Sequence, residues 1–199
     1  MNPGVPGAAY RWRTKIENTN CTVDQIVLKD GSGQPVRGNP FGDGFAIDWD
    51  GAYDCARAYV QSCANLLVKT YDIDFLKMDA VTPGSGKDNA TNWPIPPYNA
   101  HDNSRDVKEW SEALSRTGKD VWLAISWEID PDYGQVFAPL ANSWRTSMDI
   151  DCYCDVLVKW PAVKRVFKQV RAELFACNCI FESPTQGVDL NHLHAPSLR

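Results

Sequence analysis

From about residue 54 onward, the apolar positions of the chain alternate between helical and strand spacing. The first predicted helix carries apolar residues three or four positions apart: Ala56, Val60, Cys63 and Leu67. A short apolar strand is predicted next, from Asp74 to Met78, directly before Asp79. Residues 82–103 are rich in Pro, Gly and Asn, so we expect a long loop there.

The alternation continues after this loop. Ser104 is the expected N-cap of a second helix, which should bury Val107, Trp110 and Leu114 and end near Gly118. Further elements are predicted at 121–126 (strand), 132–140 (short helix) and 143–145 (strand). A last helix starts with Pro161 at its first position and has an apolar stripe: Val163, Val166, Phe167, Val170 and Leu174.

Strands that alternate with helices in this way predict an α/β fold of βα units with a parallel sheet. The strands are nearly continuous in apolar residues, as expected when both faces of a sheet are covered. The pattern alone leaves two architectures open, a (β/α)8 barrel and a doubly wound open sheet.

Two predicted strands are followed by an aspartate with a basic residue upstream. Asp79 follows Lys77 at a distance of two residues, and Asp149 follows Arg145 at a distance of four. Cleavage of a glycosidic bond needs two carboxyl groups that are held on rigid elements and face one substrate. Lys-x-Asp after an apolar strand, and later Trp-Arg-x-x-x-Asp-Ile, closely resemble glycoside hydrolase family 27 (GH27), the α-galactosidase group.

The resemblance implies a role for each of these residues. Asp79 would be the nucleophile and Asp149 the general acid/base, which must start protonated. Lys77 and Arg145 would contact the sugar, and Lys77 would also favour the ionised form of Asp79; the alternative for Lys77 is a plain surface lysine. Both aspartates have a simpler alternative as well, as ordinary carboxylates on solvated loops.

The end of the strand at 121–126 carries further candidates for sugar contact, Trp127 and Glu128. The family often places a Glu beside a Trp here to select the substrate, but in the opposite order, so the register stays open by one residue. Trp127 either faces the sugar or packs at the rim of the fold. Trp93 and Tyr98 either line a subsite or anchor their loop.

The resemblance favours a partial (β/α)8 TIM barrel with central βα units only. It predicts an incomplete catalytic barrel domain at 1–175 and a divergent, poorly ordered tail at 176–199. A full barrel has typically about 250 residues, and the family's first two strands have no counterpart. We therefore expect a truncated form, inactive when isolated. In that tail, His192 and His194 are expected to be ordinary loop residues rather than metal ligands.

The expected function is retaining hydrolysis of terminal α-D-galactosyl groups, with galactose-containing oligosaccharides or glycoconjugates as partners and no organic cofactor or metal. The alternatives are a β-L-arabinopyranosidase, an α-N-acetylgalactosaminidase, and a catalytically inactive fragment or sugar-binding remnant. The net charge of −5 and a pI near 5.2 give no basic field for nucleic acid and no polybasic membrane patch. No apolar run is long enough to span a bilayer.

Cysteines and sequons indicate an extracellular setting. Seven cysteines include two Cys-x-Cys pairs, and disulfides are favoured over a zinc site because no histidine stands at ligand spacing. Asn20 and Asn89 each begin an N-glycosylation sequon. The parent family is secreted, whereas the first residues lack the features of a signal peptide.

Overall fold

The computed structural model describes residues 1–38, 43–82, 101–129, 133–145, 149–151 and 158–167, with the backbone alone at Trp127 and Glu128. Its elements in chain order are β1 (Val5–Pro6), α1 (Gly7–Arg11), η1 (Val23–Gln25), β2 (Gly44–Phe45), α2 (Tyr53–Asn65), η2 (Leu66–Thr70), β3 (Phe75–Met78), α3 (Ser104–Ser115), β4 (Trp122–Glu128), α4 (Gly134–Phe137) and β5 (Ser143–Arg145). Residues 160–167 are also helical.

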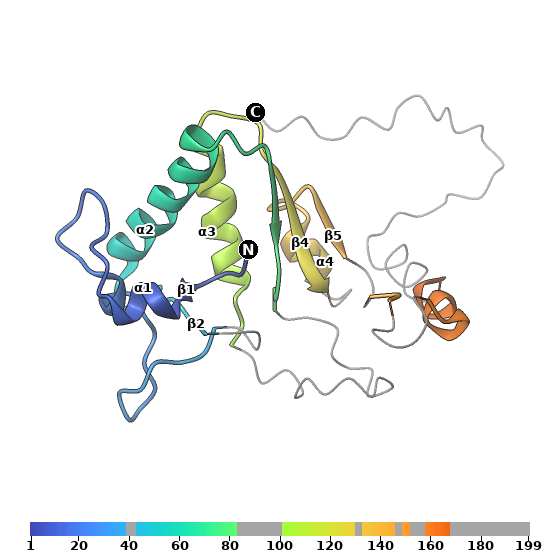
Figure 1. Ribbon diagram of the computed structural model, residues 1–199, viewed down its shortest axis with the longest axis horizontal. Coiled ribbons are helices and arrows are strands. Elements are labelled where there is room, and N and C mark those ends of the chain that lie inside the picture. Colours follow the sequence, from blue (N-terminus) through green and yellow to red (C-terminus); the bar gives the residue numbers. More distant parts are fainter. Residues whose placement is uncertain (39–42, 83–100, 130–132, 146–148, 152–157, 168–199) are drawn as a thin grey trace.

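A parallel sheet of three strands, ordered β3-β4-β5, forms the centre of the fold (Figure 1). Leu76 lies opposite Leu123, and Ile125 lies opposite Trp144. The parallel sheet and all three strand positions predicted from the sequence are confirmed, with shifts of one or two residues at the ends of β3 and β4. Each parallel strand is joined to the next by a helix, since α3 follows β3 and α4 follows β4, and these are the predicted βα repeats.

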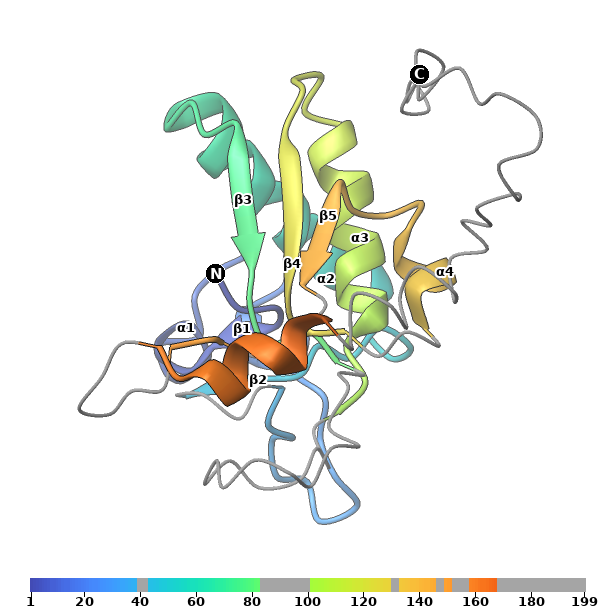
Figure 2. The same ribbon diagram turned by 90° about the vertical axis from the view of Figure 1, so that its right-hand side faces the viewer.

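One face of the sheet is covered by α2 and α3, which lie behind it in Figure 2. Side chains alternate along a strand, and Leu76, Met78, Leu123 and Ile125 are all buried in the core. Burial of one such side chain contributes about 1.5–3 kcal/mol relative to leaving it in water. The core between sheet and helices therefore fixes which face of each strand remains open.

The other face of the sheet is open. Phe75 and Trp122 are opposite each other in the register of β3 and β4, with exposed fractions of 55% and 50%. The Trp122 indole Nε1 donates a hydrogen bond of 3.0 Å to the Ser143 hydroxyl of β5. Lys77 is exposed as well, and by its register it belongs to this same face.

The buried stripe of α2 differs in part from the predicted one. Ala56 and Val60 are buried as expected, but the stripe continues through Ala64 and Val68. The predicted Cys63 and Leu67 are only partly buried beside the core. Leu66–Thr70 forms a π-helical turn at the end of α2, and its Val68 ends the buried stripe.

The start of α3 also differs from the prediction. The N-cap is Asn103, and Ser104 is the first helical residue; its amide donates to the Asp102 carboxylate at 2.9 Å. The predicted face of α3 is confirmed, because Val107, Trp110 and Leu114 are buried. Gly118 follows the helix with φ +76°, a left-handed conformation that glycine adopts without a steric penalty.

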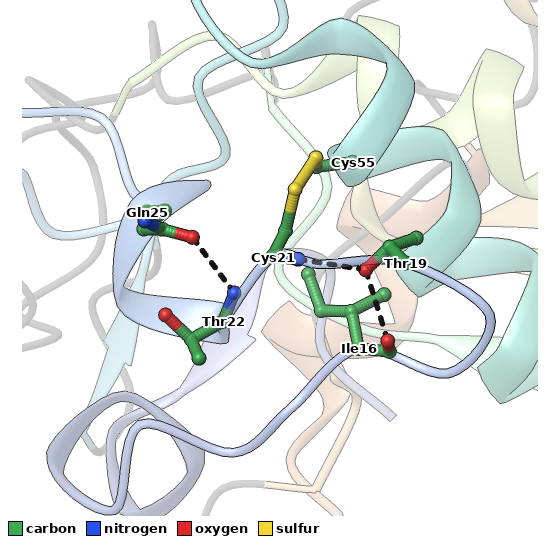
Figure 3. The surroundings of a disulfide bond; sticks show 6 residues. All are labelled: Ile16, Thr19, Cys21, Thr22, Gln25 and Cys55. Carbon is green, nitrogen blue, oxygen red and sulfur yellow. Dashed lines mark hydrogen bonds between the residues drawn. A yellow bond between two sulfur atoms is a disulfide. The ribbon is translucent and has the colours of Figure 1, made fainter.

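The first fifty residues form short antiparallel pairs, among them β1 with β2 and the bridge of Val27 with Ile47. A disulfide between Cys21 and Cys55 ties this region to the start of α2 (Figure 3). Next to Cys21, the Thr22 amide donates to the Gln25 side chain at 2.9 Å and closes a capping box over η1. None of the helices in the described ranges is long and apolar enough to cross a membrane.

Candidate active site

Asp79 is the first residue after β3, at the carboxyl end of the sheet, and its side chain is half-buried. Its backbone amide donates to the carbonyl of Met1 at 2.6 Å, and the amino group of Met1 donates to the carbonyl of Lys77 at 2.7 Å. These two bonds have the pattern of a parallel bridge, so Met1 occupies the edge of β3 beside Asp79. The predicted position at a strand end is thus confirmed.

The backbone just after Asp79 is strained and firmly held. Ala80 is buried with φ +61°, which is uncommon for a residue with a Cβ. The Asn103 side-chain amide donates to the Ala80 carbonyl at 2.8 Å, and its oxygen accepts from the Thr82 amide at 2.7 Å. Asn103 therefore fixes the segment that carries Asp79. The sequence reasoning missed this residue, because an Asn at the end of a polar loop looks like an ordinary helix cap.

Lys77 lies in β3 on the open face of the sheet, two residues before Asp79. Within the described residues it makes no ion pair with Asp79, so the expected ammonium–carboxylate contact is absent there. An exposed lysine has a long and mobile side chain. Lys77 is thus a surface residue in the structure. It belongs to the same face of the strand as Asp79, because the two residues are two positions apart.

Arg145 and Asp149 form the second part of the site. Arg145 ends β5, and its guanidinium lies 2.9 Å from the Asp149 carboxylate. The helical residues 160–167 lie across from the carboxyl ends of the strands on the open side of the sheet (Figure 2). From this segment Arg165 donates to the backbone carbonyl of Asp149 at 2.9 Å. Nothing in the sequence pattern had singled out Arg165.

Ser126 of β4 links the two parts. Its backbone carbonyl accepts from the Val81 amide at 2.8 Å, and its hydroxyl accepts from Arg145 at 3.4 Å. Ser126 is buried, so both bonds form in a site with little competition from water. The segment after Asp79 and the residue that holds Asp149 are therefore attached to the same residue of the central strand.

The environment of Asp149 is open. Its side chain is 45% exposed, and the next residue, Ile150, has an exposed fraction of 45% too. Met148 lies outside the described residues.

The remaining predicted residues are placed only by their backbone or not at all. Trp127 and Glu128 end β4, where Glu128 lies opposite Arg145 beyond a shift in register after Ile125. Trp93 and Tyr98, the sequon at Asn89 and the tail histidines lie outside the described residues. In the described ranges, no group of three or more His, Cys, Asp or Glu side chains is placed to hold a metal ion.

This arrangement has the chemistry of a carboxylate-based site. It offers one half-buried and one exposed carboxylate at the carboxyl ends of parallel strands, with a guanidinium bound to the second. Parallel α/β folds bind their ligands at these ends. Carboxylates and a planar guanidinium recognise hydroxyl groups through bidentate hydrogen bonds.

Comparisons with known proteins find similar glycoside hydrolases both among curated sequences and among solved structures. No protein-family model matches the chain. A curated relative, α-galactosidase 3 of Hypocrea jecorina, is 26% identical over 174 residues, which cover 86% of this chain and 24% of that protein. A solved structure of a GH27 β-L-arabinopyranosidase from Geobacillus stearothermophilus is similar with a TM-score of 0.65 at 22% identity, over 85% of this chain and 33% of that one.

A variant of the same bacterial enzyme, solved in complex with arabinose, is similar with a TM-score of 0.63 at 21% identity. The chain spans about a quarter of the length of the curated relative and a third of the solved structures. The structural likeness confirms the arrangement of helices and strands.

Proposed function

Because the chain is a GH27-like partial domain, we propose that it belongs to the catalytic part of a retaining glycoside hydrolase that removes terminal α-D-galactosyl groups. The observation that carries the proposal is the link through Ser126, which attaches the segment after Asp79 and the Arg145–Asp149 pair to one central strand. The name of the curated relative supports galactose as the sugar.

In the first step of the proposed mechanism, the Asp79 carboxylate attacks the anomeric carbon and the bond to the leaving oxygen breaks. Protonated Asp149 gives its proton to that oxygen. In the second step, Asp149 accepts a proton from water, the water oxygen bonds to the anomeric carbon, and Asp79 is released. The contact with Arg145 at 2.9 Å would position the Asp149 carboxyl group for both proton transfers.

The surrounding residues have supporting roles in this proposal. Arg145 and Lys77 would bind sugar hydroxyls from β5 and β3, and Trp127 and Glu128 would do so from the end of β4. We propose a partial (β/α)8 barrel for residues 1–175, with 176–199 as a separate tail. The three parallel strands and their preceding helices support the barrel, and no cofactor is needed for two-carboxylate chemistry.

A second candidate function is β-L-arabinopyranosidase activity. The similar solved structures carry that name, and one of them holds arabinose. α-Galactose and β-L-arabinopyranose share their ring configuration and differ by one exocyclic group. The pocket would therefore discriminate between the two substrates only where it contacts this exocyclic group, and the same pair of carboxyl groups would cleave either substrate.

The disulfide between Cys21 and Cys55 supports an extracellular protein, because such bonds persist in oxidising compartments. Asn20 is exposed beside this disulfide, as a glycosylated asparagine must be. We propose a secreted glycoprotein on these grounds.

The test is hydrolysis of 4-nitrophenyl α-D-galactopyranoside and 4-nitrophenyl β-L-arabinopyranoside. It uses the 199-residue chain and a longer form that supplies the segments present in the relatives. We expect the longer form to prefer the galactoside and to lose activity in both Asp79→Ala and Asp149→Ala. Activity that survives in both variants contradicts the proposal. Sugar binding without turnover in the longer form favours the remaining alternative, a catalytically inactive remnant.

A further inference from the structure

The sequon Asn20-Cys21-Thr22 lies in a closed loop that the disulfide between Cys21 and Cys55 ties to α2. The side chain of Asn20 is exposed, whereas Cys21 and Thr22 are only partly exposed. A sequon is defined by its asparagine and by the hydroxyl of its third residue, so the enzyme that transfers the glycan must contact both at once. Exposure of Asn20 alone therefore does not make the sequon usable.

Cys21, the middle residue of the sequon, is held by its backbone and by its side chain. Its amide donates to the Thr19 hydroxyl at 3.0 Å, and that hydroxyl donates to the Ile16 carbonyl at 2.9 Å (Figure 3). The carbonyl of Cys21 accepts from the Ile16 amide at 2.9 Å. Both backbone groups of Cys21 are thus used inside the loop, and its sulfur is bonded to Cys55.

Thr22, the hydroxyl residue of the sequon, is the N-cap of η1. Its amide donates to the Gln25 side chain at 2.9 Å, and its carbonyl accepts from the Gln25 amide at 3.0 Å. Thr22 also lies opposite Lys15 in an antiparallel bridge. An enzyme that contacts Asn20 and Thr22 together has to draw both out of this arrangement, so it needs the loop to open.

The disulfide controls whether the loop can open. Hydrogen bonds of a surface loop break and re-form continually, but the disulfide keeps Cys21 attached to the first turn of α2, where the next residue, Ala56, is buried in the core. Cys55 follows Cys21 by 34 residues. At about 5–20 residues per second, the sequon is therefore synthesised roughly 2–7 s before Cys55, and disulfide formation takes further seconds or longer.

From this order of events we propose that Asn20 is a glycosylation site that accepts its glycan only before the disulfide closes. In the transfer, Asn20 Nδ2 bonds to the anomeric carbon of a sugar activated as a lipid-linked diphosphate. The bond from that carbon to the diphosphate oxygen breaks, the diphosphate takes the electron pair, and Nδ2 gives one proton to the enzyme. Closure of the disulfide then leaves an attached glycan in solvent and makes an unmodified Asn20 inaccessible to the enzyme. This timing rests on the secreted setting proposed above, which supplies the oxidising conditions.

The experiment offers the full chain to a purified single-subunit oligosaccharyltransferase with a lipid-linked oligosaccharide. Mass spectrometry follows the glycan on the peptide that contains Asn20, and all chains carry Asn89→Gln to remove the second sequon. Cys55→Ser keeps the sequon but lacks the disulfide, and its initial rate should exceed that of the oxidised unaltered chain at least about tenfold, because the loop can open. Reductant should raise the rate of the unaltered chain to the same level and leave that of Cys55→Ser unchanged.

Two control variants accompany Cys55→Ser. Cys63→Ser replaces the free cysteine of the described residues and should match the oxidised unaltered chain. Asn103→Ala removes the contacts with Ala80 and Thr82 and keeps the disulfide, so its rate should stay within about threefold of the oxidised unaltered chain. It separates release of the loop from a general loss of stability.

A smaller increase in Cys55→Ser than expected overturns the proposal, because the disulfide would then not control the site. So does a rate in Asn103→Ala that reaches the rate of Cys55→Ser, or the absence of a glycan on Asn20 in both Cys55→Ser and the reduced chain. The experiment needs neither secretion nor glycosidase activity. Its failure is therefore distinct from failure of the proposed function, which the two aryl glycosides test.

Discussion

Arg145 and Asp149 form an ion pair of 2.9 Å just beyond the end of β5, and the same guanidinium reaches the Ser126 hydroxyl of β4 at 3.4 Å. The guanidinium is thus held from two strands. A carboxylate positioned in this way keeps a defined direction even though its side chain is 45% exposed. The fold therefore positions Asp149 through the ion pair with Arg145 and does not bury it.

Arg145 should therefore matter for turnover. We expect Arg145→Lys to lower kcat/KM about ten- to a hundredfold, because lysine keeps the charge but lacks the rigid, planar guanidinium that places Nη1 against both partners. The measurement is steady-state hydrolysis of an aryl glycoside by the active longer form. Arg13→Lys is the matched control, since Arg13 pairs with Asp24 on the surface, and its kcat/KM should stay unchanged. Equal values for both variants would show that Arg145 has no role in positioning.

Asn103 should stabilise the fold through the segment after Asp79. Asn103→Ala leaves the Ala80 carbonyl and the Thr82 amide without their buried partner, at a cost of roughly 1–3 kcal/mol for each. Chemical denaturation should show a loss of about 2–6 kcal/mol in the free energy of unfolding. The control Asn65→Ala removes a partly exposed contact with Gln61 and should cost less than about 0.5 kcal/mol. Similar losses in the two variants would refute the role of Asn103.

The disulfide between Cys21 and Cys55 should contribute about 2–4 kcal/mol, because it closes a long loop in the unfolded chain. Thermal melting with and without a reductant measures this. Reduction should lower the Tm of the unaltered chain by more than that of Cys21→Ser/Cys55→Ser. Cys63 is the free cysteine of the described residues, and Cys63→Ser should keep the response to reductant. If the reductant did not change the Tm of the unaltered chain, the proposed contribution of this disulfide to stability would be contradicted.

Stability should fall as the pH rises from about 4 to 7. Burial raises the pKa of Asp106 to about 7, helped by the charges of Asp102 and Glu109 and opposed by the hydrogen bond from Trp49. In the unfolded chain the same carboxyl loses its proton near pH 4. Between these values the folded chain binds more protons, so unfolding becomes easier with rising pH.

Denaturation of the unaltered chain and of Asp106→Asn at pH 5 and pH 8 tests this titration. The unaltered chain should lose stability relative to Asp106→Asn, which still accepts the bond from Trp49 but carries no charge. Asp54→Asn, at an exposed position, serves as the control and should track the unaltered chain. A constant difference between the unaltered chain and Asp106→Asn at both pH values would contradict the titration of Asp106.

The sequence predicted the elements whose patterns are local. The strand before Asp79 and the face of α3 with Val107 and Trp110 follow from apolar spacing, and both were found where expected. The parallel pairing followed from the βα alternation. The first two features depend on periodicity within one element and the third on the order of elements along the chain, and a single sequence contains both.

The contacts that hold the site could not be predicted in the same way. Ser126 bonds to Val81 and Arg145 because of the register of three strands, and Asn103 reaches Ala80 across a long loop. Such contacts depend on how elements meet in space, and the residues concerned have no special spacing.

The central claim is that Asp79 is the nucleophile, and covalent trapping tests it most directly. An activated aryl α-galactoside, added to Asp149→Asn in the longer form, should complete the first step and stall before the second, because no base activates water. Peptide mass spectrometry should then find one hexosyl group on the peptide that contains Asp79, and none in Asp79→Asn/Asp149→Asn. A hexosyl group on any other residue, or an unmodified Asp79 while the aryl alcohol is released in a burst, would contradict the assignment.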